Sequence, residues 1–334
     1  MTILFYLILY LLIIYITLSV SKRLELYDSP DERKIHTGKI INTSGVSLYI
    51  YLLFVITLNE LSYDIEKIIT VGIFVVIIGF IDDRKSINAF SKIILLIFPI
   101  FFLINSGLIL NDLGQYELLG TVYLNKFNLV FTILACGLLI NAFNYIDGVD
   151  GLLISTTIVS ISYAILLLTD DKVINLLILI LIPLIVNLFF NFLPANNINK
   201  IFMGDAGSLF IGFFISFLMI YLYKIQNIHP AYLIWMCWYP VYDFLSVTII
   251  RIIKKTKFYL PDNLHLHNDL LKLKKNNHYK VTMAITFINI LITIVGFATT
   301  KYFGYIFSLI IFNLFFVFFL FLRCYFNGIK FNRR

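Results

Sequence analysis

The stretch Asn141-Ala-Phe-Asn144-Tyr-Ile-Asp147-Gly148-Val-Asp150-Gly151 interrupts long apolar runs on both of its sides. Its amide and carboxylate side chains recur every three residues, which would spread them over roughly half the circumference of one straight helix. Gly148 and Gly151 therefore predict that the helix breaks here and lets the polar groups turn toward a common point. Oxygen ligands gathered without a lysine or arginine between them suit a hard divalent cation and a sugar nucleotide. The alternative interpretation is a polar loop that only joins two membrane helices.

The composition around this stretch excludes an ordinary soluble domain. Of the 334 residues 60% are hydrophobic and 13% are charged, and the mean hydropathy is +0.92. This length holds about ten or eleven spans of about 20 residues and little else. We therefore predict one all-α polytopic transmembrane domain over residues 1–334. Cys136, Cys237 and Cys324 are scattered in apolar runs and are interpreted as packing residues rather than disulfides or zinc ligands.

Apolar segments predict eleven transmembrane helices, at 2–20, 45–59, 66–81, 90–106, 127–141, 152–169, 173–193, 207–224, 231–250, 281–299 and 303–323. Basic residues then set the orientation. All 26 Lys and Arg residues lie on one side of these spans except Lys67, Lys126, Lys172, Lys224 and Lys301. Because basic loops mark the cytoplasmic face, we expect the N-terminus outside, the C-terminus in the cytoplasm, and insertion in the inner (cytoplasmic) membrane.

The net charge of +7 could suggest a nucleic-acid partner. The basic loops, of which 251–280 is the largest, instead face the anionic headgroups of the inner leaflet. The sequence therefore predicts the lipid bilayer, and no nucleic acid, as a partner. On the outer side, Gly107, Gly114 and Gly120 around short apolar runs indicate a hairpin within 106–126.

The acidic residues favour an enzyme over a transporter. A proton- or ion-coupled transporter is expected to keep an ionisable group near the middle of the membrane. Here no acidic residue falls at the centre of a predicted span, and Asp243 is the nearest to an exception. An enzyme that acts on lipid headgroups would instead place its acids at the cytoplasmic boundary, where most of the others lie. Asp243 is interpreted either as a packing partner for a neighbouring donor or as a site residue.

Three further motifs lie at that boundary. Asp82-Asp83 is an adjacent like-charged pair, which is costly unless a cation or donors offset it. Phe202-Met-Gly-Asp205-Ala-Gly-Ser208 places one carboxylate before a helix that Ser208 could cap and whose backbone N–H groups could face an anion. His265 and His267, close to many basic residues, suit hydrogen bonds to phosphate oxygens better than a zinc site. Each motif alone could be an ordinary loop end; their occurrence together indicates one site.

At these residues the sequence resembles the polyprenyl-phosphate N-acetylhexosamine-1-phosphate transferases, glycosyltransferase family 4, of the undecaprenyl-phosphate GlcNAc-1-phosphate transferase type. The resemblance runs from about Asp28 to His267 and includes the plan of eleven spans. The matching positions are Asp28, Pro30, Arg33, Lys34, His36, Asp82, Asp83, Lys92, Asn141, Asn144, Asp147, Gly148, Asp150, Gly151, Leu152, Phe202 through Ser208, Pro261, Asp262, His265 and His267. One departure is Asn268, which stands where the family has a final histidine, with Asp269 after it.

The resemblance implies transfer of N-acetylhexosamine-1-phosphate from a UDP-sugar, UDP-GlcNAc first, to undecaprenyl phosphate. The products would be undecaprenyl-diphosphate-sugar and UMP, as in the first membrane step of cell-envelope polysaccharide (O-antigen, lipopolysaccharide or cell-wall) synthesis. The same reaction on another UDP-N-acetylsugar is one alternative, and a polytopic transporter of a lipid-linked sugar is another. A homodimer is a further possibility.

The resemblance also implies roles for individual residues. Mg²⁺, with Mn²⁺ as a substitute, would be bound by Asp205 and the Asn144 oxygen. Lys92, His265 and His267 would hold phosphate oxygens, with Arg251 as a further candidate. Asp82 and Asp83 would orient or deprotonate the lipid phosphate. The nucleotide side would be lined by Asp147, Asp150 and Phe202.

Overall fold

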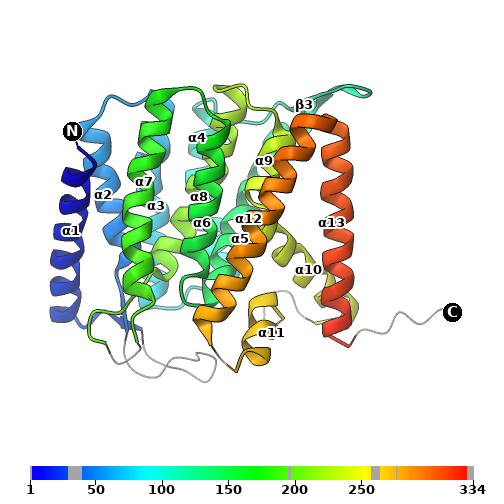
Figure 1. The fold of residues 1–334 in the computed structure, drawn as a ribbon. Helices are drawn as coiled ribbons and strands as arrows, with labels where there is room; N and C mark the ends of the chain where they lie inside the picture. The colour runs from blue at the N-terminus through cyan, green and yellow to red at the C-terminus, as the bar shows by residue number, and fades with distance from the viewer. Residues whose placement is uncertain (1, 29–39, 195–196, 257–263, 276, 329–334) are drawn as a thin grey trace.

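The computed structural model describes residues 2–28, 40–194, 197–256, 264–275 and 277–328. The chain is mostly helical, and its long helices stand side by side with their ends at two common levels (Figure 1). Within the described residues these helices are α1 (Ile3–Arg23), α2 (Ser44–Leu58), α3 (Tyr63–Arg84), α4 (Ala89–Asn105), α5 (Asn128–Tyr145), α6 (Leu152–Leu167), α7 (Asp171–Asn191), α8 (Gly204–Lys224), α9 (Pro230–Met236), α10 (Trp238–Lys254), α12 (His278–Phe303) and α13 (Tyr305–Phe326). The helix α11 (Leu266–Leu273) is short, as is α9, and it lies at the end of the bundle where α13 finishes, opposite the start of α1.

Every predicted span coincides with a helix or with a pair of helices, and the chain is a multi-pass membrane protein. Within the described residues, six helices are long and apolar enough to cross a membrane, or seven if the bent pair α9–α10 counts as one crossing. The helices α2, α4 and α6 are apolar but shorter. The predicted span 231–250 is not one continuous helix, because α9 and α10 meet at a bend of 75°. Cys237 at the bend has non-helical backbone angles, and Pro240 cannot donate the backbone hydrogen bond that would continue the helix.

The helix α8 lies at the centre of the bundle. In its most apolar stretch 89% of the residues are buried, against 6% for α13. It packs against α2, α3 and α5. Glycines make these contacts unusually close. A Cβ on Gly45 of α2 would lie 2.3 Å from the Gly207 nitrogen of α8. A Cβ on Gly79 of α3 would lie 2.5 Å from Ala206 Cα of α8. Small residues of this kind let membrane helices approach closely and gain van der Waals contact.

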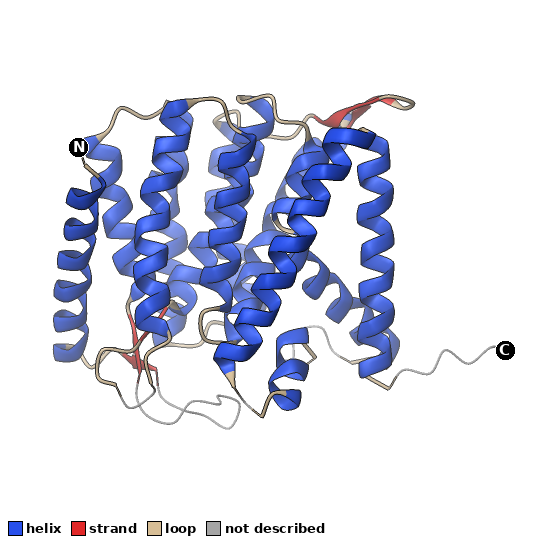
Figure 2. Ribbon diagram, viewed as in Figure 1, coloured by secondary structure: helices blue, strands red, loops and turns tan. Residues whose placement is uncertain are grey.

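Two small groups of strands go beyond the all-α prediction, and they lie at opposite ends of the helices (Figure 2). At the end that carries α11, β1 (Tyr27–Asp28), β2 (Ile40–Asn42) and β5 (Ile201–Phe202) form a three-stranded sheet. Asn42 pairs with Phe202 in a parallel register, so the segment before α2 is fixed to the segment before α8. At the other end, β3 (Asp112–Tyr116) and β4 (Gly120–Tyr123) pair antiparallel, which confirms the hairpin predicted within 106–126.

The three cysteines are buried and unpaired, as predicted for packing residues. Cys136 lies in α5, Cys324 lies in α13, and Cys237 joins α9 to α10.

Gly79→Ala tests the close approach of α3 and α8. The new methyl group would overlap the backbone of Ala206, so we expect the free energy of unfolding to fall by about 1–3 kcal/mol. Gly137→Ala is the matched control, because Gly137 is also helical but has no atom within 4 Å of an added Cβ. Thermal unfolding midpoints in detergent measure both changes. Equal midpoints for the two variants would contradict the packing described.

Candidate active site

The first turn of α8 is held by a carboxylate from the end of α3. Asp83 Oδ1 accepts a hydrogen bond from the Asp205 backbone N–H at 2.9 Å, and Oδ2 accepts one from the Ala206 N–H at 3.2 Å. The Asn42 amide donates to the same carboxylate at 3.3 Å. A negative charge at a helix N-terminus satisfies orphan N–H groups and favours the helix dipole. The sequence predicts that the N–H groups at this helix start face an anion. Here they face the carboxylate of Asp83.

Two other carboxylates meet at one ammonium group. The Lys92 side chain forms an ion pair with Asp82 and lies 3.6 Å from Asp205 Oδ2. Asp82 also accepts a hydrogen bond from the Ile87 N–H at 2.6 Å. The Asp205 side chain is 32% exposed, whereas that of Asp82 is 6% exposed. Asp205 is thus the carboxylate in this group that a ligand can reach most easily.

Asn144, in the last turn of α5, completes this group. Its Nδ2 donates to Asp205 Oδ1 at 2.5 Å and to Ser208 Oγ at 2.8 Å. The amide nitrogen thus faces Asp205, and the role of the Asn144 oxygen as a metal ligand stays a prediction. Ser208 does not cap α8, because the helix already begins at Gly204 and the serine lies in its second turn. Its hydroxyl instead positions Asn144.

The predicted break in the 141–151 stretch is confirmed. The helix α5 ends at Tyr145, a short 3-10 helix (η2, Ile146–Gly148) follows, and Gly151 adopts a left-handed conformation with φ of 75° before α6. The break does not gather all four polar groups, because Asn141 donates to its own helix at Gly137 O. It does bring Gly148 against the ring of His267, whose Nε2 lies 3.0 Å from where a Cβ would sit.

His265 and His267 form a buried stacked pair beside this break. Their ring centroids are 5.4 Å apart and their ring planes are nearly parallel. His265 also contacts the ring of Tyr145, the residue after Asn144. Asp243, on α10, accepts hydrogen bonds from His265 Nδ1 at 2.7 Å and from the Leu266 N–H at 2.8 Å. Asp243 thus packs against a donor, as one of its two interpretations predicted, and that donor is a candidate site residue. Since Nδ1 of His265 is engaged, Nε2 is the atom left for a substrate.

His267 differs from its neighbour. Burial lowers the pKa of His267 to about 3, even though the charge of Asp243 acts in the opposite direction. Its Nδ1 is buried and has no hydrogen-bond partner among the described residues. His267 is therefore neutral at pH 7, and it can donate from only one ring nitrogen.

Asp150 and Phe202 lie in a third group. Asp150 Oδ2 pairs with Lys200 Nζ at 2.6 Å, and Oδ1 lies 3.5 Å from His278 Nδ1. Burial alone would raise the pKa of the Asp150 carboxyl, but His278 and Lys200 together hold that pKa below its ordinary value. The Lys200 ammonium also lies 5.5 Å from the centroid of the Phe202 ring, so this lysine joins the two residues predicted for the nucleotide side.

The structure thus brings most of the predicted residues to one end of the bundle. Asp205 is in direct contact with both Asp83 and Asn144. Tyr145, the residue after Asn144, contacts the ring of His265. Asp147 lies in η2 between these groups, and Arg251 is buried in the last turn of α10. The predicted positions that lie outside the described residues are Pro30, Arg33, Lys34, His36, Pro261 and Asp262, and the side chain of Asp28 is also not described.

Sequence reasoning missed several polar residues of this region. Lys200 and His278 belong to none of the motifs that the sequence shows. Asn42 had no motif around it. The buried Lys200 and the partly buried His278 leave no local signal in the sequence, because their partner, Asp150 in both cases, is 50 or more residues away.

The side chains present fit a magnesium ion that shares its coordination with a substrate. Asp205 and Asp82 already accommodate a positive charge between them, that of Lys92. Among the described residues no group of three or more His, Cys, Asp and Glu side chains could hold a metal alone. Mg²⁺ is commonly bound by one or two carboxylates together with water and substrate phosphates. Asp205, the more exposed of the two carboxylates, would supply such a ligand.

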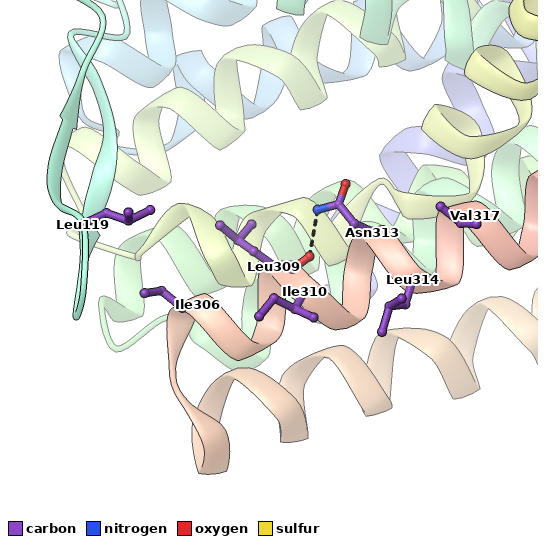
Figure 3. A pocket seen from close by; sticks show the side chains of 7 residues that line it. All are labelled: Leu119, Ile306, Leu309, Ile310, Asn313, Leu314 and Val317. Atoms are coloured by element: carbon purple, nitrogen blue, oxygen red, sulfur yellow. Dashed lines mark hydrogen bonds between the residues drawn. The ribbon is translucent and has the colours of Figure 1, made fainter.

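An apolar groove on α13 is a different kind of surface (Figure 3). It is lined by Leu119 of the hairpin and by Ile306, Leu309, Ile310, Asn313, Leu314 and Val317. None of these side chains is titratable, so this groove cannot supply the charges that phosphoryl transfer requires.

A comparison with protein families assigns the chain. The model of glycosyl transferase family 4 matches residues 66–223, a range that includes Asp82, Lys92, Asn144 and Asp205. A protein of Bacillus subtilis (strain 168) is 30% identical over 251 residues, which cover 73% of this chain and 69% of that protein. The chain belongs to glycosyl transferase family 4. The histidine pair of this family 4 protein lies outside the range that the family model matches.

The relatives of this family 4 protein carry closely similar names. The Bacillus subtilis protein is described as a probable undecaprenyl-phosphate N-acetylglucosaminyl 1-phosphate transferase. The undecaprenyl-phosphate alpha-N-acetylglucosaminyl 1-phosphate transferase of Escherichia coli (strain K12) is 28% identical over 278 residues, 78% of this chain and 73% of that protein. The transferase of the same name from Yersinia pestis is 29% identical over 272 residues, with the same two coverages.

The lowered pKa of His267 predicts a loss of stability in acid. In the unfolded chain His267 takes up a proton near pH 6.5, whereas in the folded protein its ring stays neutral until the pH falls to about 3. The stabilisation from this group is complete above pH 6.5 and is lost as the pH falls through that window, by about 1.4 kcal/mol per pH unit. We expect His267→Asn to remove this contribution. Unfolding midpoints of both proteins at pH 7.5 and 5.5 measure it, and an unchanged pH dependence in the variant would contradict the burial described.

Proposed function

We propose that the protein transfers N-acetylglucosamine-1-phosphate from UDP-GlcNAc to undecaprenyl phosphate and releases UMP. The observation that carries the proposal is the meeting of Asp82, Asp205 and Lys92 beside Asn144, with the histidine pair next to them at the same end of the bundle. The names of the relatives, all of them transferases of this sugar phosphate, support the choice of substrates.

In this reaction an oxygen of the lipid phosphate attacks the β-phosphorus of the nucleotide sugar. The bond between that phosphorus and the oxygen that bridges it to the α-phosphate breaks, and UMP leaves with the bridging oxygen. Because an incoming phosphate and a diphosphate repel one another, charge neutralisation and in-line positioning dominate catalysis. A site at the boundary of the membrane lets the lipid headgroup meet a water-soluble nucleotide.

Four cationic or hydrogen-bond-donating side chains are candidates for contacting the phosphates. The Lys92 ammonium, held between two carboxylates, would contact phosphate oxygens at its free positions. His265 would present Nε2 to a phosphate oxygen and would donate from it as the imidazolium, because its Nδ1–H already donates to Asp243. His267, neutral and stacked on His265, would donate from one ring nitrogen, and Arg251 is a further candidate.

The aspartate pair has divided roles. Asp83 accepts hydrogen bonds from two backbone N–H groups of α8. Its role would therefore be to position Asp205 and not to act on the lipid phosphate itself. Asp82, paired with Lys92, would orient the lipid phosphate or take a proton from it. A strong base is not required, because a phosphate monoester with a second pKa of about 6 is mostly dianionic at pH 7. Direct displacement is therefore favoured over a covalent aspartyl intermediate.

Mg²⁺, or Mn²⁺ in its place, would be held by Asp205, with Asn144 beside it. When bound, the ion would supply positive charge to the diphosphate as a Lewis acid. On the nucleotide side, Phe202 would offer its ring to the uracil, while Asp147 and Asp150 would line the pocket. Lys200, paired with Asp150 and close to Phe202, would hold these two residues together.

The proposed topology has eleven crossings, with the N-terminus outside and the site at the cytoplasmic face of the inner membrane. The basic loops predicted from the sequence and the opposite ends at which α1 begins and α13 finishes support it (Figure 1). A homodimer is compatible with this topology. Another UDP-N-acetylsugar is the second candidate donor, since Asn268 replaces the third histidine of the motif that the family shows.

Asp205→Asn tests the reaction and the metal assignment together. Membranes that contain the protein, with Mg²⁺, labelled UDP-GlcNAc and undecaprenyl phosphate, should form UMP and a labelled lipid. We expect the variant to lose roughly a hundredfold or more in turnover, because it removes a charge from the group at the reaction centre. Asp64→Asn is the matched control, because Asp64 pairs with Lys67 at the opposite end of α3. Near-normal turnover in Asp205→Asn would remove the metal assignment.

A panel of UDP-GlcNAc, UDP-GalNAc, UDP-FucNAc and UDP-QuiNAc separates the candidate donors. We expect UMP release to be fastest with UDP-GlcNAc. Preference for another sugar would keep the reaction and change the substrate. No turnover with any of the four, from protein that remains folded, would favour a transporter of lipid-linked sugars.

A further inference from the structure

A fully buried arginine lies on the helix that is otherwise most exposed. Only 6% of the residues in the most apolar stretch of α13 are buried, as expected of a helix that faces lipid. Arg323, in its last turn, is nevertheless 1% exposed. A guanidinium is costly to bury unless its partners compensate for the lost water. The hydrogen-bond partners of Arg323 therefore indicate which part of the structure this charge stabilises.

Within the described residues, both hydrogen bonds of the Arg323 guanidinium go to the segment that carries the two histidines. One terminal nitrogen donates to Asp269 Oδ2 at 2.5 Å, and the other donates to the Leu264 carbonyl oxygen. Leu264 directly precedes His265, and Asp269 follows His267 by two residues. The guanidinium thus joins the two ends of the short segment that contains both histidines.

The docking of α13 does not depend on this contact. Earlier in the helix, Ser308 Oγ accepts a hydrogen bond from Trp235 Nε1 at 2.9 Å. The Tyr242 ring packs against Phe312 and Phe316, with ring centroids 5.0 and 5.1 Å away. These contacts fix α13 to α9 and α10 well before Arg323 is reached. The arginine therefore acts on the histidine segment more than on its own helix.

The two histidines need this support to different degrees. Asp243 holds the ring of His265 directly. The buried Nδ1 of His267 has no hydrogen-bond partner among the described residues, so the position of this ring depends on the backbone that carries it and on packing. The Leu264 carbonyl and the Asp269 side chain are the points at which Arg323 fixes that backbone.

We propose that Arg323 is a positioning residue, which holds the 264–269 segment so that His265 and His267 face the phosphates of the substrate. The proposal rests on the transfer reaction proposed above, and it places part of the catalytic geometry under the control of the C-terminal helix. A lysine cannot replace this function fully, because one ammonium lacks the planar fork with which Arg323 reaches both partners at once.

The first experiment measures kcat and KM for Arg323→Gln, Arg323→Lys and Asp269→Asn in the UMP-release assay. We expect kcat to fall roughly ten- to a hundredfold in Arg323→Gln, since a small misplacement of catalytic groups costs about this much. The KM for the nucleotide sugar should change little, because the nucleotide side of the site at Phe202 is not held by Arg323. Arg323→Lys should recover part of the loss.

Lys254→Gln is the matched control. Lys254 bonds Asn327 at the end of α13, so this variant also removes a contact between α13 and the rest of the bundle but leaves the histidine segment untouched. We expect its kcat to equal that of the wild type. A loss as large as that of Arg323→Gln would show that the docking of α13, and not the histidine segment, is what matters.

The double variant Arg323→Gln with Asp269→Asn provides a second test. If the two residues act as one unit, the double variant should lose no more kcat than the worse single variant. Additive losses, or wild-type kcat in both single variants, would overturn the proposal. If Arg323→Gln does not fold, as judged by its unfolding midpoint, Arg323→Lys and Asp269→Asn decide the question. Inactive wild-type protein would instead count against the transfer reaction itself.

Discussion

The structure of the site depends on the close approach of α3 to α8, which lets the Asp83 carboxylate cap the first turn of the central helix. Gly79 permits this approach because a side chain there would overlap Ala206. The cap satisfies the backbone N–H groups of Asp205 and Ala206 and so fixes the direction in which Asp205 leaves the helix. The remaining polar groups, Asn144 and Lys92, are arranged around that carboxylate.

Among the described residues, the carboxylates of the site are held by one ammonium group and by backbone donors. Asp82 and Asp205 share one ammonium, that of Lys92, while Asp83 is offset by backbone donors. Like charges at such distances are costly when they are partly buried. A bound cation would reduce that cost and attract the phosphates at the same time. The Mg²⁺ proposed for this site commonly shares its coordination between carboxylates, water and substrate phosphates.

The two histidines differ from the carboxylates in that both are buried, and their positions depend on residues of other helices. Asp243 of α10 orients the ring of His265, and Arg323 of α13 holds the backbone around both histidines. The resemblance to the family is broken next to these residues by Asn268, and the following Asp269 is the residue that binds Arg323. The position of the segment is thus set by helices that are remote in the sequence.

The sequence by itself determined the apolar helices, the break between Asn144 and Gly151, and most of the residues at the site. Hydrophobic length and glycine placement are local properties, so they can be seen in one stretch of chain. Only the tertiary structure decided that Asp83 caps α8 in place of Ser208, that α9 and α10 form a bent pair, and that Lys200 and Arg323 support the site. Apart from the bend between α9 and α10, these features are pairings between groups 50 or more residues apart. Nothing within either segment specifies its partner, because the partner is chosen by how closely the helices pack.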